Sequence, residues 1–274
     1  MIDKTLFKSN SKQYTTPYGN VLIHYAARSI GVRVSGGFDS AIMLYLIAKT
    51  VYETNSGAQI YPFTVRRVNT TDEHSYNRVN SYIYADAVIE YVKKQFPNVV
   101  IHPAIKEDAN YWWVADHING RNISSYTTAQ QNLSRYNKWR LARQRIINEV
   151  QPDITDIMYI DYGGTTKNPT VGIIPQSEES HRDTSSSNTI CKDSVTTAIG
   201  DVTNGHVIYT EPFRNADKRI TLWLADTHLI LQDVLDMTKS CEGGPYETVE
   251  FSKECGKCWW CLEREWALEN YKND

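Results

Sequence analysis

The sequence lacks a long apolar run. No segment approaches the ~20 residues that cross a bilayer, and polar residues 1–10 contain no signal-peptide core. It also lacks an excess of charge of one sign, since 29 Lys and Arg against 32 Asp and Glu give a net charge of −3. Such a chain has no general electrostatic attraction for nucleic acid. These absences predict a cytoplasmic protein with no membrane partner, argue against nucleic acid as a partner, and leave a homodimer open.

Cysteine is scarce and unevenly placed. Cys191 stands alone, whereas Cys255, Cys258 and Cys261 are three residues apart and Cys241 lies fourteen positions upstream. In a reducing compartment this clustering indicates a metal site rather than disulfides. The alternatives are buried free thiols, a redox pair and an iron–sulfur cluster. A redox Cys-x-x-Cys pair is not expected to have a third cysteine at the same spacing. We therefore expect the four clustered thiolates to form a tetrahedral structural Zn²⁺ site.

The pattern of apolar residues predicts the fold class. The chain is 41% hydrophobic and 22% charged, which is ordinary for a globular protein. The expected strands are 30–34, 59–68, 99–105, 156–161 and 206–209, and the expected helices are 41–53, about 71–96, 127–150 and 218–228. Residues 106–122 are expected to be a loop. This alternation predicts a doubly wound α/β fold with a mainly parallel sheet, whose ligands bind beyond the carboxyl ends of the strands.

A glycine-rich turn between the first expected strand and helix carries most of the chemical information. It consists of Ser35, Gly36, Gly37, Phe38, Asp39 and Ser40. Glycines let the backbone approach a ligand, and the N–H groups at a helix start attract anions, most often phosphate. Ser35 and Ser40 can donate hydrogen bonds, and Asp39, expected outside the core, can hold Mg²⁺. A plain helix cap is the alternative, but the whole string favours phosphate binding. Because no lysine follows the glycines, the turn is not a Walker A loop.

This string resembles the signature loop of the ATP pyrophosphatase (PP-loop) family. The resemblance implies an adenine nucleotide alpha hydrolase-like fold, in which the loop holds the β- and γ-phosphates of ATP. It further implies cleavage between the α- and β-phosphates, with AMP and pyrophosphate as products. The expected ligand-binding residues are Ser35, Gly36, Gly37, Phe38, Asp39 and Ser40.

Two further blocks resemble the 7-cyano-7-deazaguanine synthase family. One is the segment 211–213 with Lys218 and its helix, and the other comprises residues 240–244 and 255–264 around the cysteines. The family implies that ATP adenylates a 7-deazapurine carboxylate, which ammonia converts to an amide and then to a nitrile. The resemblance makes Asp39, Ser40 and Lys218 the expected catalytic residues, although Lys218 either reaches a phosphate or is merely solvated. The family's Asp-Cys-Arg pattern does not follow the fourth expected strand.

These observations predict an ATP-binding domain at 1–235, with a variable insertion at about 106–204, and a zinc lobe at 236–274. The polar segment 176–204 is read as a disordered insertion or a lid. The expected ligands are ATP, Mg²⁺ and Zn²⁺. An amide ligase, a tRNA-thiolating enzyme that uses the same loop, and a non-catalytic nucleotide-binding module are the alternative functions.

Overall fold

The computed structural model describes residues 10–25, 27–68, 81–110, 159–162, 199–200, 207–210, 212–213, 217–241 and 253–272. The helix predicted at 127–150 lies outside these residues, as do Cys191, Glu211 and most of the polar segment 176–204.

Within the described residues, a six-stranded sheet forms the centre of the molecule. Its spatial order is β5-β4-β3-β6-β8-β7. The strands are β3 (Ser29–Arg33), β4 (Gln59–Val68), β5 (Ile105–Asn110), β6 (Tyr159–Tyr162), β7 (Ile199–Gly200) and β8 (Val207–Thr210). All neighbouring pairs are parallel except β7 with β8. Because the chain adds β4 and β5 on one side of β3 and β6 and β8 on the other, the order reverses at β3. The fold is therefore a doubly wound α/β sheet, as the sequence predicts.

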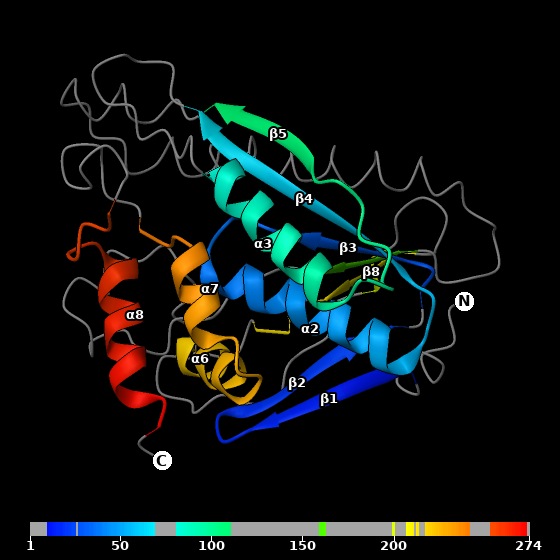
Figure 1. Cartoon of the computed structure of the whole chain (residues 1–274), viewed down its shortest axis with the longest axis horizontal. Helices are drawn as coiled ribbons and strands as arrows, with labels where there is room; N and C mark the ends of the chain where they lie inside the picture. The colour runs from blue at the N-terminus through cyan, green and yellow to red at the C-terminus, as the bar shows by residue number, and fades with distance from the viewer. Residues whose placement is uncertain are drawn as a thin grey trace.

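Helix α2 (Phe38–Thr54) follows β3 and is buried along nearly its whole length. With α3 (Ser81–Gln95) it covers the near face of the sheet in Figure 1. A hairpin of β1 (Ser11–Thr16) and β2 (Gly19–His24) packs against α2, where the Tyr14 hydroxyl lies 2.8 Å from Thr50 Oγ1. Helix α2 contacts the sheet, α3 and the hairpin. Apolar residues therefore occupy most of its sides rather than a single stripe.

Three further helices, α6 (Lys218–Thr227), α7 (Leu231–Met237) and α8 (Trp259–Asn270), lie at one end of α2. The carboxylate of Asp217 caps α6 by accepting a hydrogen bond from Arg219 N at 2.9 Å. Helix α8 packs on α6, and Ala267 and Tyr271 belong to the main hydrophobic core. The Tyr18 hydroxyl donates to Tyr271 O at 2.7 Å, so the hairpin also contacts the end of α8. The C-terminal residues are thus packed into the body of the fold.

Most predicted elements agree with the structure to within a few residues, but the third strand does not. The sequence predicts it at 99–105, whereas only a single bridge pairs Ile101 with Ile60 and the strand runs from Ile105 to Asn110. Pro103 has no N–H group to donate to the ladder, which resumes where Ile105 pairs with Phe63. The predicted loop at 106–122 is therefore wrong for residues 106–110. The range 106–204, predicted as a variable insertion, contributes β5, β6 and β7 to the sheet.

Candidate phosphate and metal sites

The glycine-rich turn lies at the carboxyl end of β3, next to the point where the strand order reverses. Gly36 has φ +78°, a conformation that glycine adopts without steric cost. Gly37 is the N-cap of α2, and the first bond of the helix runs from Ala41 N to Gly37 O at 3.2 Å. The preceding N–H groups of the helix therefore have no acceptor within it and point out of its N-terminus. This is the geometry that binds an anion.

Hydrogen bonds within the turn hold its shape. The Ser40 hydroxyl donates to Gly37 O at 2.9 Å and accepts from Ser35 N at 3.1 Å. The Ser35 and Ser40 hydroxyl oxygens lie 3.1 Å apart. Ser40 is 3% exposed, so its hydroxyl shapes the loop from the inside. We call residues 35–40 the phosphate loop from here on.

Asp39 lies on the buried side of the phosphate loop. Its carboxylate accepts from Lys218 Nζ at 3.0 and 3.1 Å and from the Thr221 hydroxyl at 3.1 Å. Asp39 is 7% exposed and Lys218 is 1% exposed. The expectation that Asp39 lies outside the core is therefore wrong, and so is the alternative that Lys218 is solvated. A magnesium ion at Asp39 would have to share the carboxylate with the Lys218 ammonium group.

A second carboxylate completes this buried group of charges. Glu263 Oε2, on α8, lies 3.5 Å from Lys218 Nζ, and Glu263 is fully buried. Buried charges are retained only when they are paired, because removing them from water is costly. One buried ammonium group thus faces a carboxylate from the phosphate loop and a carboxylate from the C-terminal helix. Sequence reasoning predicted the roles of Asp39 and Lys218 separately and missed Thr221 and Glu263, which no local spacing connects to them.

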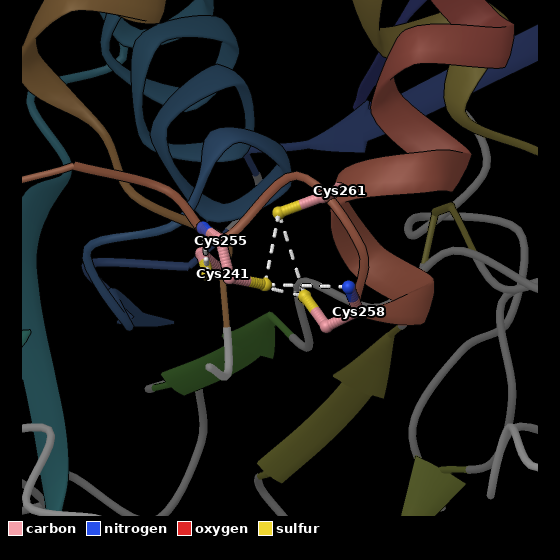
Figure 2. Close-up of side chains that lie close together, drawn as sticks. All are labelled: Cys241, Cys255, Cys258 and Cys261. Atoms are coloured by element: carbon pink, nitrogen blue, oxygen red, sulfur yellow. Dashed lines mark hydrogen bonds between the residues drawn. The ribbon is translucent and has the colours of Figure 1, made fainter. Parts of the chain in front are cut away.

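The four clustered cysteines converge as predicted (Figure 2). Their sulfur atoms all lie within 4.8 Å of one another, and the structure forms no disulfide among them. The distance is 3.4 Å from Cys258 Sγ to Cys261 Sγ, and 3.9 Å for the pairs Cys255–Cys261 and Cys241–Cys258. The backbone N–H of Cys255 donates to Cys241 Sγ, and that of Cys258 donates to Cys255 Sγ, both at 3.3 Å. Backbone donors of this kind orient and stabilise metal-bound thiolates.

The crowded sulfur atoms need a cation to ionise together. Hydrogen bonds with Cys241 and Cys258, followed by burial, raise the pKa of the Cys261 thiol. Four adjacent thiolates without a cation would repel one another, whereas a bound metal ion deprotonates its thiol ligands. The donor set therefore fits a thiophilic metal ion.

The first of the four clustered cysteines follows a segment that contacts the phosphate loop. Phe38 N donates to the Ser240 hydroxyl at 3.4 Å, and Lys239 N donates to Gly36 O at 2.9 Å. A Cβ atom added to Gly37 would touch Ser240 Oγ at 3.4 Å. Sequence reasoning treated Ser240 only as a neighbour of the first cysteine, because nothing in a linear pattern shows that residue 240 contacts residue 38.

Comparisons with known proteins give only distant likenesses. The chain matches no protein-family model and no curated protein sequence. Among solved structures it is similar to an NMN synthetase from Francisella tularensis, with 13% identity, TM-score 0.39, and coverage of 85% of this chain and 72% of the other. It is similar to an NAD+ synthetase from Burkholderia pseudomallei, with 14% identity, TM-score 0.35, and coverage of 90% and 83%. It is also similar to a U34-tRNA thiolase with a [4Fe-4S] cluster from Methanococcus maripaludis, with 14% identity, TM-score 0.38, and coverage of 89% and 65%.

No helix in the described part of the chain is both long and apolar enough to cross a membrane.

Proposed function

We propose that this protein is an ATP-dependent enzyme that cleaves ATP between the α- and β-phosphates and adenylates a 7-deazapurine carboxylate. The observation that carries the proposal is the phosphate loop, an anion-binding helix start at the reversal point of a doubly wound sheet. The resemblance of residues 35–40 to the PP-loop signature supports ATP as the anion. The blocks around Lys218 and the cysteines support the 7-cyano-7-deazaguanine synthase reaction.

In this mechanism the loop binds the pyrophosphate that leaves. N–H groups at the start of α2 and the Ser35 hydroxyl donate hydrogen bonds to the β- and γ-phosphates. A substrate carboxylate oxygen attacks the α-phosphorus, the bond to the β-phosphate oxygen breaks, and pyrophosphate departs. Donors fixed before the reaction stabilise the charge that develops on the leaving group. Ammonia then attacks the acyl carbon, loses a proton and displaces AMP to give the amide.

The amide oxygen then attacks the α-phosphorus of a second ATP and displaces a second pyrophosphate. The C–O bond breaks, a second AMP leaves with the oxygen, and the nitrogen loses its two protons to give the nitrile. Mg²⁺, when bound at Asp39, supplies charge compensation for the phosphates. Lys218 holds both oxygens of the Asp39 carboxylate by hydrogen bonds, which gives Lys218 a positioning role even where it does not touch a phosphate.

The cysteine site holds zinc in this proposal. Two thiolates bound at 2.3 Å to one tetrahedral ion lie roughly 3.8 Å apart, close to the sulfur separations of 3.4 and 3.9 Å. In a four-iron cluster each thiolate binds a different iron, so its sulfur atoms are farther apart than ligands that share one ion. Elemental analysis of the purified protein should find about one zinc per chain. Iron in its place, or less than half a zinc per chain, would overturn this assignment.

The decisive test of function is product analysis. The protein is incubated with ATP, Mg²⁺, ammonium and 7-carboxy-7-deazaguanine, and the products are identified by mass spectrometry. The expected products are AMP, pyrophosphate and the deazapurine amide or nitrile. Release of ADP and phosphate would reject the pyrophosphatase mechanism. AMP and pyrophosphate released only with another acceptor would retain that mechanism and reject the deazapurine.

Asp39→Asn should lower turnover roughly 10²–10³-fold, because losing one preorganised electrostatic group costs ~2.7–4 kcal/mol of transition-state stabilisation. Asparagine keeps the size of the buried side chain, and Lys218 retains Glu263 as a charged partner, so circular dichroism should show an unchanged fold. Ser35→Ala is the matched control in the same loop and should lose only ~0.5–1.5 kcal/mol, since it removes one neutral hydroxyl. Full activity of Asp39→Asn would contradict the proposed role of Asp39.

A further inference from the structure

Two separate connections join the cysteine site to the phosphate loop. The first is the segment 239–241. Lys239 N donates to Gly36 O at 2.9 Å, the Ser240 hydroxyl accepts from Phe38 N at 3.4 Å, and the next residue is Cys241. The segment therefore contacts the turn on both sides of Gly37 and continues directly into a metal ligand.

The second connection runs through buried charges. Glu263 lies two residues after Cys261 on α8, and its Oε2 atom is 3.5 Å from Lys218 Nζ. Lys218 in turn donates to both oxygens of Asp39. Glu263 is 0%, Lys218 1% and Asp39 7% exposed, so water screens these charges weakly. A shift of α8 would change the environment of a charged group in the phosphate loop.

Both connections begin beside cysteines whose converging sulfur atoms could hold a metal ion. Cys241 and Cys261 are themselves buried, and all four sulfur atoms lie within 4.8 Å of one another. A metal ion bound by these cysteines would fix the two chain segments that carry Ser240 and Glu263. Those residues in turn contact the N-terminal turn of α2, where the proposed phosphate donors lie.

We propose that metal loading of the four cysteines sets the affinity of the phosphate loop for ATP, with Ser240 and Glu263 as the positioning residues that transmit the effect. This inference rests on the proposed nucleotide site and adds a regulatory link to it. The Ser240 hydroxyl accepts from Phe38 N, so the 239–241 segment positions the N-terminal turn of α2, which carries the proposed phosphate donors.

The coupling must be reciprocal. If metal tightens ATP binding by some factor, ATP must tighten metal binding by the same factor, because both describe one thermodynamic cycle. Coupling between two sites in one protein typically amounts to roughly 5- to 150-fold in affinity. An effect in this range should be visible in two independent equilibrium measurements.

The experiment measures both halves of the cycle on the full chain. The dissociation constant of magnesium-ATP is determined by calorimetry for zinc-loaded and zinc-depleted protein without acceptor. The zinc dissociation constant is determined by equilibrium competition with a chromophoric chelator, with and without magnesium-ATP. Zinc-loaded protein should bind ATP about 5- to 150-fold more tightly, and ATP should raise zinc affinity by the same factor.

Three variants test the route in zinc-loaded protein, which avoids reliance on the depleted form. Ser240→Ala and Glu263→Gln should each weaken ATP binding and reduce the effect of ATP on zinc affinity, and the double variant should abolish that effect. Thr238→Val is the matched control. It removes a hydroxyl from the same segment, but that hydroxyl donates to Val234 O within α7. Its ATP affinity and coupling should equal those of the wild type.

The outcomes separate the two proposals. ATP binding that is tight but identical with and without zinc would overturn the coupling and leave the proposed nucleotide site standing. A coupling that Thr238→Val reduces as much as Ser240→Ala would also overturn the assigned route. Absence of ATP binding by zinc-loaded wild-type protein would overturn both the coupling and the proposed function.

Discussion

The phosphate loop and the cysteine site are neighbours built in opposite ways. The phosphate loop consists of six consecutive residues fixed by β3 on one side and α2 on the other. The cysteine site draws Cys241 from one segment and the other three ligands from another, and its thiols need a cation to ionise together. A contiguous loop between two buried elements is formed by folding alone. A site assembled from separate segments depends on what it binds.

This difference predicts which site tolerates perturbation. Chelation should disturb the 253–272 segment first, because a structural metal contributes folding free energy locally. The sheet and α2 are held by a continuous apolar core that includes Ile30, Val32 and most of α2. Buried charges and the 239–241 segment nevertheless link the two sites, so neither is independent of the other.

The largest expected effect is at Lys218, which pairs with Asp39 of the phosphate loop and with Glu263, two residues after Cys261. Lys218→Met removes the buried ammonium group and leaves the Asp39 and Glu263 carboxylates without their shared partner. Breaking a buried ion pair in this way costs about 3–5 kcal/mol, and urea denaturation monitored by circular dichroism should show that loss. The same variant should lower both ATP affinity and zinc affinity, because Asp39 belongs to the phosphate loop and Glu263 lies on the helix that carries Cys261.

A double variant provides the control. Asp39→Asn combined with Lys218→Met removes an uncompensated charge along with its former partner, so it should be more stable than Lys218→Met alone. A single Lys218→Met variant with wild-type stability would show that the two sites are not joined through buried charge.

The phosphate loop could be predicted from the sequence because all of its information is local. Gly36 and Gly37 between an apolar run and a helix start specify the turn, and the structure places them at the end of β3. The convergence of the four cysteines could also be predicted, because three share one spacing and a metal site requires a fourth ligand. Neither inference needed the distance between loop and cysteines.

The contacts that join the two sites could not be predicted in this way. Ser240 and Phe38 are 202 positions apart, and Lys218 and Asp39 are 179 apart. Such pairs depend on how α6 and α8 pack on α2, which hydrophobic spacing within each helix does not determine. The hairpin β1–β2 and helix α7 were missed for a simpler reason. They are too short for their apolar positions to establish a period.

A smaller effect is expected at Leu229. A change there should alter the stability of the protein without affecting either the phosphate loop or the cysteine site. Leu229 follows α6 with φ +58° and is 90% exposed, whereas Asn55 occupies the matching position after α2 with φ +49°. Asparagine tolerates the left-handed conformation, but leucine is strained there. Leu229→Gly should raise the free energy of unfolding by about 1 kcal/mol. Glycine removes the backbone strain, and its greater loss of chain entropy on folding offsets only part of that gain.

Leu229→Ala is the control for this change, because it removes the exposed side chain and keeps the strained Cβ. Thermal denaturation should show stabilisation for glycine and little for alanine. ATP affinity and zinc content should stay at wild-type values in both. Equal stabilisation by alanine would assign the effect to the exposed apolar surface instead of the backbone.

The smallest effect is expected at His228, and only below neutral pH. Burial, together with the positive charge of Lys49, lowers the pKa of His228, while Glu53 acts in the opposite direction and partly cancels the shift. The stability that depends on neutral His228 is fully present above about pH 6.5, the ordinary histidine pKa. It is lost as the pH falls from that value through the lowered folded-state pKa.

His228→Phe should remove this part of the acid sensitivity and retain ring packing against Tyr14 and Tyr45. Urea unfolding measured from pH 8 to pH 5 would then separate two causes of acid unfolding, because the proposed zinc site would also weaken as its thiolates are protonated. The variant should keep only the zinc-dependent part, which disappears when the comparison is repeated on zinc-depleted protein. Unchanged acid sensitivity in His228→Phe would assign the whole pH dependence to the cysteine site.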